Sequence, residues 1–100
     1  MTPLDKRLAH GGFDRKLRPE PVDYFACEGL ALKGRGKWRD ALCVFHDDAR
    51  PSLRINIETG AFKCMSCGAH GSDVIAFHMQ RFGLRFVDAA KQLNAWEPAR

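Results

Sequence analysis

Alternating apolar and polar positions predict a short antiparallel sheet in the middle of the chain. Within residues 52–57, apolar side chains alternate with polar ones, as in a strand with one buried face. A turn over residues 58–60 then leads into a returning strand at residues 61–64. Upstream, residues 30–33 and 37–42 have the composition of two more strands joined by a glycine-containing turn. We expect a sheet of about four to five short strands.

Apolar residues at helical spacing predict helices on both sides of this sheet. The first covers residues 22–29, directly after two prolines, and a glycine ends it. The second begins at Ser72 or Asp73, either of which can cap a helix, and extends to residue 82, before a glycine. The third covers residues 86–94. Together with the sheet, these helices indicate a small α+β fold.

The length of 100 residues allows one small domain. We assign residues 1–19 to a basic flexible tail with a short helical turn around residues 4–9. Residues 20–95 form the folded domain and residues 96–100 a C-terminal tail. Apolar residues make up 45% of the sequence, which is enough for a core. A domain this small is marginally stable, so a bound metal or partner would stabilise it.

No apolar run in the sequence is long enough to span a membrane, and the N-terminus lacks the apolar segment of a secretory signal. We therefore expect a cytoplasmic protein without membrane association. Disulfide bonds are rare in that compartment, so the cysteines need another explanation.

Two ligand pairs with the same spacing supply that explanation. Cys43 and His46 are separated by two residues, and so are Cys64 and Cys67. This spacing lets a tight knuckle direct both side chains at one ion, and Gly68 permits the positive φ that closes the second knuckle. Three thiolates and one imidazole suit zinc and leave no coordination position for a substrate water. We predict one structural Zn²⁺ in a small zinc ribbon.

Two other residues compete for the fourth ligand position. Cys27 lacks a nearby partner and reads more simply as a small residue on the first helix. His70 lies three residues after Cys67, in a glycine-rich loop. A redox dithiol is the alternative for Cys64 and Cys67, but that motif normally opens a helix after a strand of a parallel sheet.

The net charge of +4 suggests an anionic partner, and nucleic acid is the commonest one. Basic side chains gather on the predicted strands and their turn, where they can form one face that neutralises phosphates. Aromatic residues among them can stack on bases, although Phe45 and Phe62 fit better as a core beside the metal, because a small ribbon needs apolar cover there. The candidate DNA-binding residues are Lys33, Arg35, Lys37, Trp38, Arg39, Arg54 and Lys63.

The stretch CVFHDDARPSLRINIETGAFKCMSCGAHGSDVIAF resembles the Cys-His-Cys-Cys zinc finger at the N-terminus of bacterial-type DNA primases, including phage and plasmid relatives. Phe45, Phe62, Phe77 and the Pro51-Ser52 pair are in register with the ligands in that family. Upstream and downstream segments extend the resemblance to residues 20–94. Val44 departs from the family, which usually has proline at this position.

The resemblance implies a module that contacts single-stranded template DNA and helps select where a primer starts. It also implies partners, namely a separately encoded primase polymerase domain or a replicative helicase. We expect the chain not to be an enzyme by itself, because the polymerase domain of a full primase is absent from it. Asp47 or Asp48 is a candidate acceptor that orients the imidazole of His46. The alternative function is a zinc finger that binds a protein partner without binding DNA.

Overall fold

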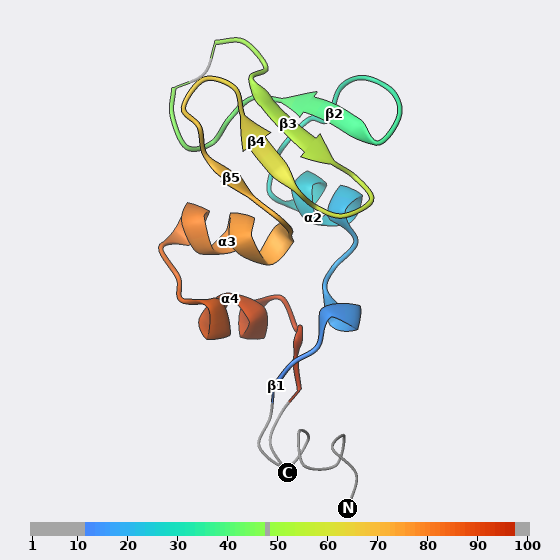
Figure 1. The fold of residues 1–100 in the computed structure, drawn as a ribbon, viewed down its shortest axis with the longest axis vertical. Coiled ribbons are helices and arrows are strands. Elements are labelled where there is room, and N and C mark those ends of the chain that lie inside the picture. The colour runs from blue at the N-terminus through green and yellow to red at the C-terminus, as the bar shows by residue number, and fades with distance from the viewer. Residues whose placement is uncertain (1–11, 48, 98–100) are drawn as a thin grey trace, which may run out of the picture.

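The computed structural model describes residues 12–47 and 49–97, whose elements are arranged along one long axis (Figure 1). A four-stranded antiparallel sheet with the order β2-β3-β4-β5 occupies one end. The elements in chain order are β1 (Gly12–Phe13), a 3-10 helix η1 (Arg15–Leu17), α2 (Pro21–Cys27), β2 (Trp38–Ala41), β3 (Leu53–Asn56), β4 (Phe62–Cys64), β5 (His70–Gly71), α3 (Val74–Phe82), α4 (Phe86–Gln92) and β6 (Trp96–Glu97). The predicted α+β class is confirmed.

The sheet differs from the prediction at both of its edges. Residues 30–33 do not form a strand, and only Lys33 pairs with β2, through a bridge to Asp40. The intervening turn contains Gly34 and Gly36 in left-handed conformations, with φ of 106° and 79°. It opens into a wide loop, which leaves room for only one bridging pair. At the other edge, His70–Gly71 adds the two-residue strand β5, which sequence patterning did not predict.

Local signals explain the ends of the helices. Pro21 occupies the first turn of α2, where its missing N–H costs no hydrogen bond. The Asp73 carboxylate accepts a hydrogen bond from the N–H of Ala76 at 2.9 Å and so caps α3. Gly83 ends α3 with a left-handed φ of 65°. Helix α4 ends at Gln92, two residues before the predicted end.

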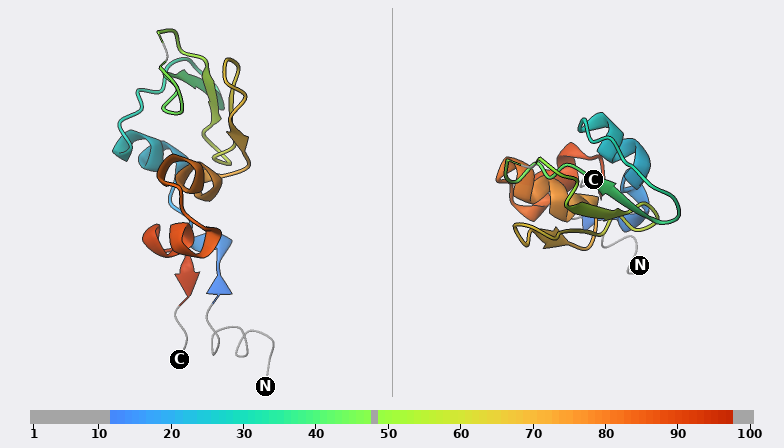
Figure 2. Two further views of the ribbon diagram at one scale, coloured as in Figure 1. Left: turned by 90° about the vertical axis from the view of Figure 1, so that its left-hand side faces the viewer. Right: turned by 90° about the horizontal axis from the view of Figure 1, so that it is seen from above.

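The core lies between the sheet and the helices α2 and α3. Figure 1 shows α2 behind the sheet and α3 beside β5, and Figure 2 shows the same arrangement from two other sides. Phe77 of α3 lies at the centre, with its ring 4.9 Å from that of Phe25 on α2 and 5.1 Å from that of Phe62 on β4. Leu53 and Ile55 complete this core from β3 and are fully buried. The apolar positions of the alternating pattern in residues 52–57 therefore lie on the inner face of the sheet, as predicted.

The two ends of the described chain pair with each other, on the far side of α4 from the large sheet. Strand β1 pairs antiparallel with β6, so that Phe13 lies opposite Trp96 (Figure 2). Both strands, and η1, lie in segments that the sequence predicts to be tails. The expected helical turn around residues 4–9 lies outside the described residues. Within residues 12–47 and 49–97, none of the helices is long and apolar enough to cross a membrane.

Candidate metal centre

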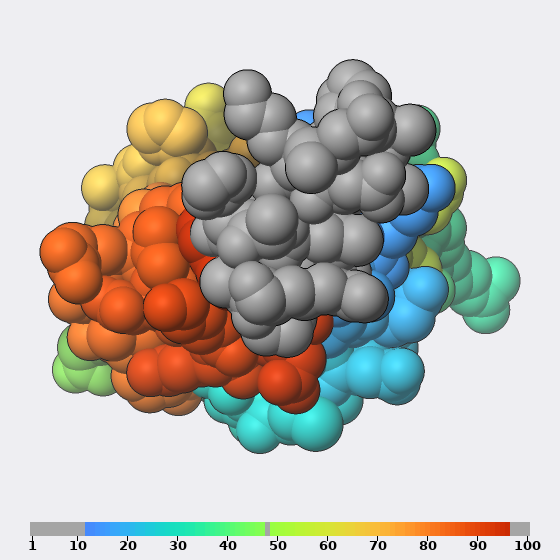
Figure 3. Space-filling model, turned by 90° about the horizontal axis from the view of Figure 1, so that it is seen from below, coloured from blue at the N-terminus to red at the C-terminus, as the bar shows by residue number. Residues whose placement is uncertain are grey.

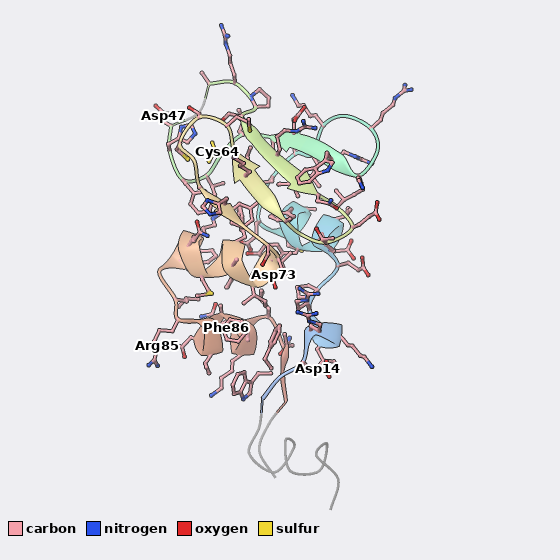
Figure 4. The ribbon with its side chains drawn as sticks, viewed as in Figure 1. Asp14, Asp47, Cys64, Asp73, Arg85 and Phe86 are labelled. Atoms are coloured by element: carbon pink, nitrogen blue, oxygen red, sulfur yellow. The ribbon has the colours of Figure 1, made fainter. Side chains whose placement is uncertain are left out.

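Two loops at one end of the sheet bring the four predicted metal ligands together. Cys43 and His46 lie in the loop that follows β2, and Cys64 and Cys67 lie where β4 ends. Their ligand atoms all lie within 4.8 Å of one another. The Sγ atoms of Cys43 and Cys67 are 3.9 Å apart, and Nε2 of His46 is 3.3 Å from Sγ of Cys64. Figure 4 labels Cys64 and Asp47 at this end of the molecule.

Backbone N–H groups are directed at the sulfurs in both knuckles. The N–H groups of Ser66 and Cys67 donate to Sγ of Cys64 at 3.4 and 3.3 Å. In the first knuckle, the N–H of Phe45 donates to Sγ of Cys43 at 3.4 Å. Gly68 has a φ of 82° and donates to the Cys64 carbonyl, which closes the second knuckle as its sequence position predicts. These donors favour thiolates, the form that binds metal.

A backbone carbonyl orients His46. Nδ1 of His46 lies 3.1 Å from the carbonyl oxygen of Asp47 and donates its proton to it, so Nε2 presents its lone pair to the cluster. The sequence predicts a carboxylate, of Asp47 or Asp48, in this role. The structure assigns it to the backbone of Asp47, and Asp48 lies outside the described residues.

The local environment separates the pKa values of two of the thiols. Burial raises the pKa of the Cys43 thiol to about 12. Burial also acts to raise the pKa of Cys64, but hydrogen bonds from the Cys67 backbone, the Ser52 hydroxyl and the Ser66 backbone outweigh it and lower that pKa to about 5. In the folded knuckle these hydrogen bonds favour the Cys64 thiolate, the form that binds metal. When bound, Zn²⁺ supplies the positive charge that holds all the thiolates deprotonated.

The donor set fits one structural zinc ion. With Zn–S bonds of about 2.3 Å, tetrahedral geometry separates two sulfurs by about 3.8 Å. The observed 3.9 Å between Cys43 and Cys67 agrees with that value. Three sulfurs and one nitrogen complete a tetrahedron, so the site is closed to a substrate water.

Neither rival ligand joins this cluster. Cys27 is exposed on α2, and Nδ1 of His70 lies 3.0 Å from the Gly68 carbonyl. The Cys64–Cys67 pair sits on a knuckle after an antiparallel strand and not at the start of a helix, unlike a redox dithiol.

The aromatic residues beside the cluster belong to the core. Phe62 is buried, and its ring stacks on that of the half-buried Phe45 at 6.1 Å. Phe45 also contacts Phe77 edge-on. Both rings therefore pack in the core and are poorly placed to stack on a base. Trp38 differs, because 39% of its surface is exposed on β2.

Cross-strand register gathers part of the predicted basic set into one row. Asp40 lies opposite Arg54, Arg54 opposite Lys63, and Lys63 opposite His70, while Lys33 bridges to Asp40 from the outer edge. Residues directly opposite each other in a sheet share a face. These five side chains therefore form one row across the outer face, which we call the basic row: Lys33, Asp40, Arg54, Lys63 and His70.

The remaining candidates lie elsewhere. Arg39 is opposite the fully buried Ile55, so register places it on the other face, where its Nε donates to the Gly36 carbonyl at 2.7 Å. Arg35 and Lys37 are exposed at the wide loop before β2. Sequence reasoning missed Asp40 and His70 as members of the row. Only the strand register, which patterning does not fix, reveals them.

The fold and the four-ligand cluster define a zinc-ribbon domain. Comparison with known families gives a match to the CHC2 zinc finger, the DnaG-type zinc ribbon, over residues 22–97. The chain belongs to this family, and its site is the zinc site of a DnaG-type primase zinc domain.

Known primases show the same similarity. The chain is 41% identical to the DNA primase of Lactococcus lactis over 93 residues, which are 93% of this chain and 14% of that protein. It is also 41% identical to the Escherichia coli K12 DNA primase over 82 residues, 82% of this chain and 14% of that protein. The chain thus spans about a seventh of the length of these relatives.

A solved structure supports the fold. The crystal structure of the Aquifex aeolicus primase, containing zinc-binding and RNA polymerase domains, superposes with a TM-score of 0.64 at 28% identity. The match covers 93% of this chain and 21% of that one.

Proposed function

We propose that this zinc domain contacts single-stranded template DNA during primer synthesis by a DNA primase. The observation that supports this proposal is the basic row. Three side chains that are positively charged at neutral pH, Lys33, Arg54 and Lys63, cross the exposed face of the sheet, and His70 continues the line. A row of cations suits a phosphate backbone that crosses the strands.

Trp38 supplies the second requirement for binding a single strand. It precedes Asp40 by two residues on β2 and so lies on the same face as the basic row. Its exposed indole can stack on a base, and such stacking tolerates any sequence. A cationic surface beside an aromatic platform is the usual design of sites that bind single strands without strict sequence preference.

The proposal extends to the partners of the domain. The closed zinc site suggests that the metal holds the fold together and does not take part in a reaction. We propose that the domain acts beside a primase polymerase domain or a replicative helicase, in the cytoplasm.

Binding of a fluorescent single-stranded oligonucleotide, followed by anisotropy across a salt series, tests the proposal. The protein is zinc-loaded, and its zinc content is measured on the same sample. We expect binding to weaken as salt rises, with a log–log slope that falls by about 0.7 for each lost phosphate contact. The variant R54A/K63A should therefore bind more weakly and with a shallower slope.

Arg39→Gln is the matched control, because it removes one positive charge from the same sheet but from the other face. It should retain most of the affinity. No binding at low salt, with one zinc per chain, would remove the DNA role and leave the zinc domain intact. Equal losses in Arg39→Gln and Arg54→Ala would show that net charge matters and the basic row does not.

A second candidate function is docking on a protein partner. Phe82 on α3 and Phe86 and Val87 on α4 are large apolar side chains with 51%, 40% and 36% of their surface exposed. They lie on the two C-terminal helices and not on the sheet, and Figure 3 shows α4 exposed on part of the lower face. Binding through this surface would change little with salt, which separates the two candidates in the same experiment.

A further inference from the structure

One acidic side chain interrupts the basic row. Asp40 stands between Lys33 and Arg54 in the cross-strand register. On a surface that binds phosphates, a carboxylate at this position opposes binding by simple electrostatics. Its presence therefore calls for a local explanation.

The contacts of Arg54 supply that explanation. Nε of Arg54 lies 3.2 Å from Oδ1 of Asp40, and both side chains are about half exposed. The guanidinium carbon of the same Arg54 lies 5.9 Å from the centre of the Trp38 ring. A single arginine therefore contacts a carboxylate on one side and an indole on the other.

This arrangement contributes little to the stability of the fold. An exposed ion pair contributes little free energy, and so does an exposed cation–π contact. The arrangement instead fixes the position of the Arg54 side chain. A long arginine side chain loses rotamer freedom when it is held at two points, and its planar guanidinium then lies against the Trp38 ring. The Asp40 carboxylate contacts the side chain of Arg54. The backbone of Asp40 makes two hydrogen bonds of 2.8 Å with the backbone of Lys33, and these do not involve the carboxylate.

We propose that Asp40 is a positioning residue for base stacking. It holds Arg54 against Trp38, so that the indole is fixed in orientation and a DNA base stacks on its open surface. Arg54 remains available to a phosphate of the same strand through its remaining N–H groups. This inference rests on the proposed function, because its ligand is the single-stranded DNA that the basic row is proposed to bind.

The proposal predicts a change in affinity opposite in sign to that expected from net charge. Asp40→Asn makes the surface more positive, so electrostatics alone predicts tighter DNA binding. If Asp40 positions the stack, Asp40→Asn instead weakens binding to an ordinary oligothymidylate by about threefold, which corresponds to losing one exposed cation–π contact. Trp38→Ala should weaken the same binding by about tenfold, because it removes the platform.

An abasic oligonucleotide of equal length separates stacking from charge. This oligonucleotide has phosphates and no bases. Asp40→Asn should therefore bind it as tightly as the unchanged chain does, or more tightly. Glu58→Gln is the matched control, since it removes one negative charge from the exposed turn between β3 and β4. It should not weaken binding to either oligonucleotide. Asp40→Glu keeps the charge and should restore part of the affinity for oligothymidylate.

A measurement without DNA guards against a purely structural effect. The fluorescence of Trp38 is the part of the tryptophan emission that is lost in Trp38→Phe. Iodide should quench this emission more strongly in Asp40→Asn, because Arg54 no longer covers the indole ring. Zinc content should stay at one per chain. Tighter binding of Asp40→Asn to oligothymidylate would overturn the positioning role and leave the DNA function standing. Absence of salt-sensitive binding by the unchanged chain to either oligonucleotide would instead overturn the proposed function.

Discussion

The hydroxyl of Tyr24 lies 2.7 Å from Nδ1 of His78, and this contact joins α2 to α3 inside the core. On its other side, Nε2 of His78 lies 2.8 Å from Oε1 of Gln92 on α4. An amide oxygen only accepts, so Nε2 carries the imidazole proton and Nδ1 accepts the proton of Tyr24. Two hydrogen bonds thus connect three helices through one buried histidine.

Removing the Tyr24 hydroxyl should destabilise the domain. Tyr24→Phe leaves Nδ1 of His78 buried without its donor, and an unsatisfied buried acceptor costs about 1–3 kcal/mol. Urea unfolding of the zinc-loaded protein measures the change, and zinc content should stay the same. In the double variant Y24F/H78L both partners are apolar, so its loss should be smaller than the sum of the two single losses. Strict additivity would show that the two groups do not interact.

The burial of Tyr24 has a consequence at high pH. Burial first, and then the charge of Glu28, raise the pKa of Tyr24 above its ordinary value, while Arg81 acts in the opposite direction. A raised pKa means that the folded state retains the phenolic proton. The stability that the buried Tyr24 phenol contributes is therefore complete below about pH 10, which is the pKa of tyrosine in the unfolded chain. This contribution is lost as the pH rises toward the higher pKa of Tyr24 in the folded protein.

Ultraviolet absorbance of phenolate reports this directly, because Tyr24 is the only tyrosine in the chain. In urea the titration should be centred near pH 10. In the folded protein it should begin only at higher pH and should coincide with unfolding. A folded protein that titrates near pH 10 would contradict the burial argument.

Much of the fold follows from local sequence signals. Alternation in residues 52–57 predicts β3, and Asp73 and Gly83 mark both ends of α3. Strands β5 and β6 contain two residues each, which is too short for any periodicity. They form because tertiary contacts place them beside β4 and β1. The strand predicted for residues 30–33 is wrong because turn conformation overrides composition there.

The candidate site divides in the same way. Ligand spacing alone identifies the zinc cluster, since a knuckle is a local structure. The basic row depends on which residues lie opposite each other across strands, and a shift of one residue would exchange the faces. Sequence reasoning therefore placed Arg39 with Arg54, and it left out Asp40, whose role depends on its neighbour on β3.

Gly71 is required by close packing and not by backbone conformation. A Cβ at this position would lie 2.5 Å from Cε1 of Phe62 and 2.7 Å from Cβ of Ala76. Because Phe62 is buried in the aromatic core, it has little room to move. Gly71→Ala should destabilise the domain by about 1–3 kcal/mol, as overpacking does, in the same urea experiment.

Phe62→Leu tests the cause of that loss. The smaller side chain removes the ring atoms that a Cβ at position 71 would meet. The double variant F62L/G71A should therefore be more stable than the sum of the single changes predicts. If Gly71→Ala were as stable as the unchanged chain, β5 would have to shift away from Phe62 without a loss of stability, and the close-packing argument would be wrong.

The zinc ligands can be separated from their rivals by single substitutions. Cys64→Ser removes the thiol at the centre of the second knuckle. We expect this variant to lose the zinc and most of its folded structure. The reason is that metal binding contributes about 10 kcal/mol or more to the folding of such domains. Cys27→Ser and His70→Ala are matched controls outside the cluster and should retain one zinc per chain. Elemental analysis after gel filtration gives the zinc content, and circular dichroism gives the fold. If Cys27→Ser lost the metal while His46→Ala kept it, the fourth ligand would have to be reassigned, since a tetrahedral ion accepts only one of the two.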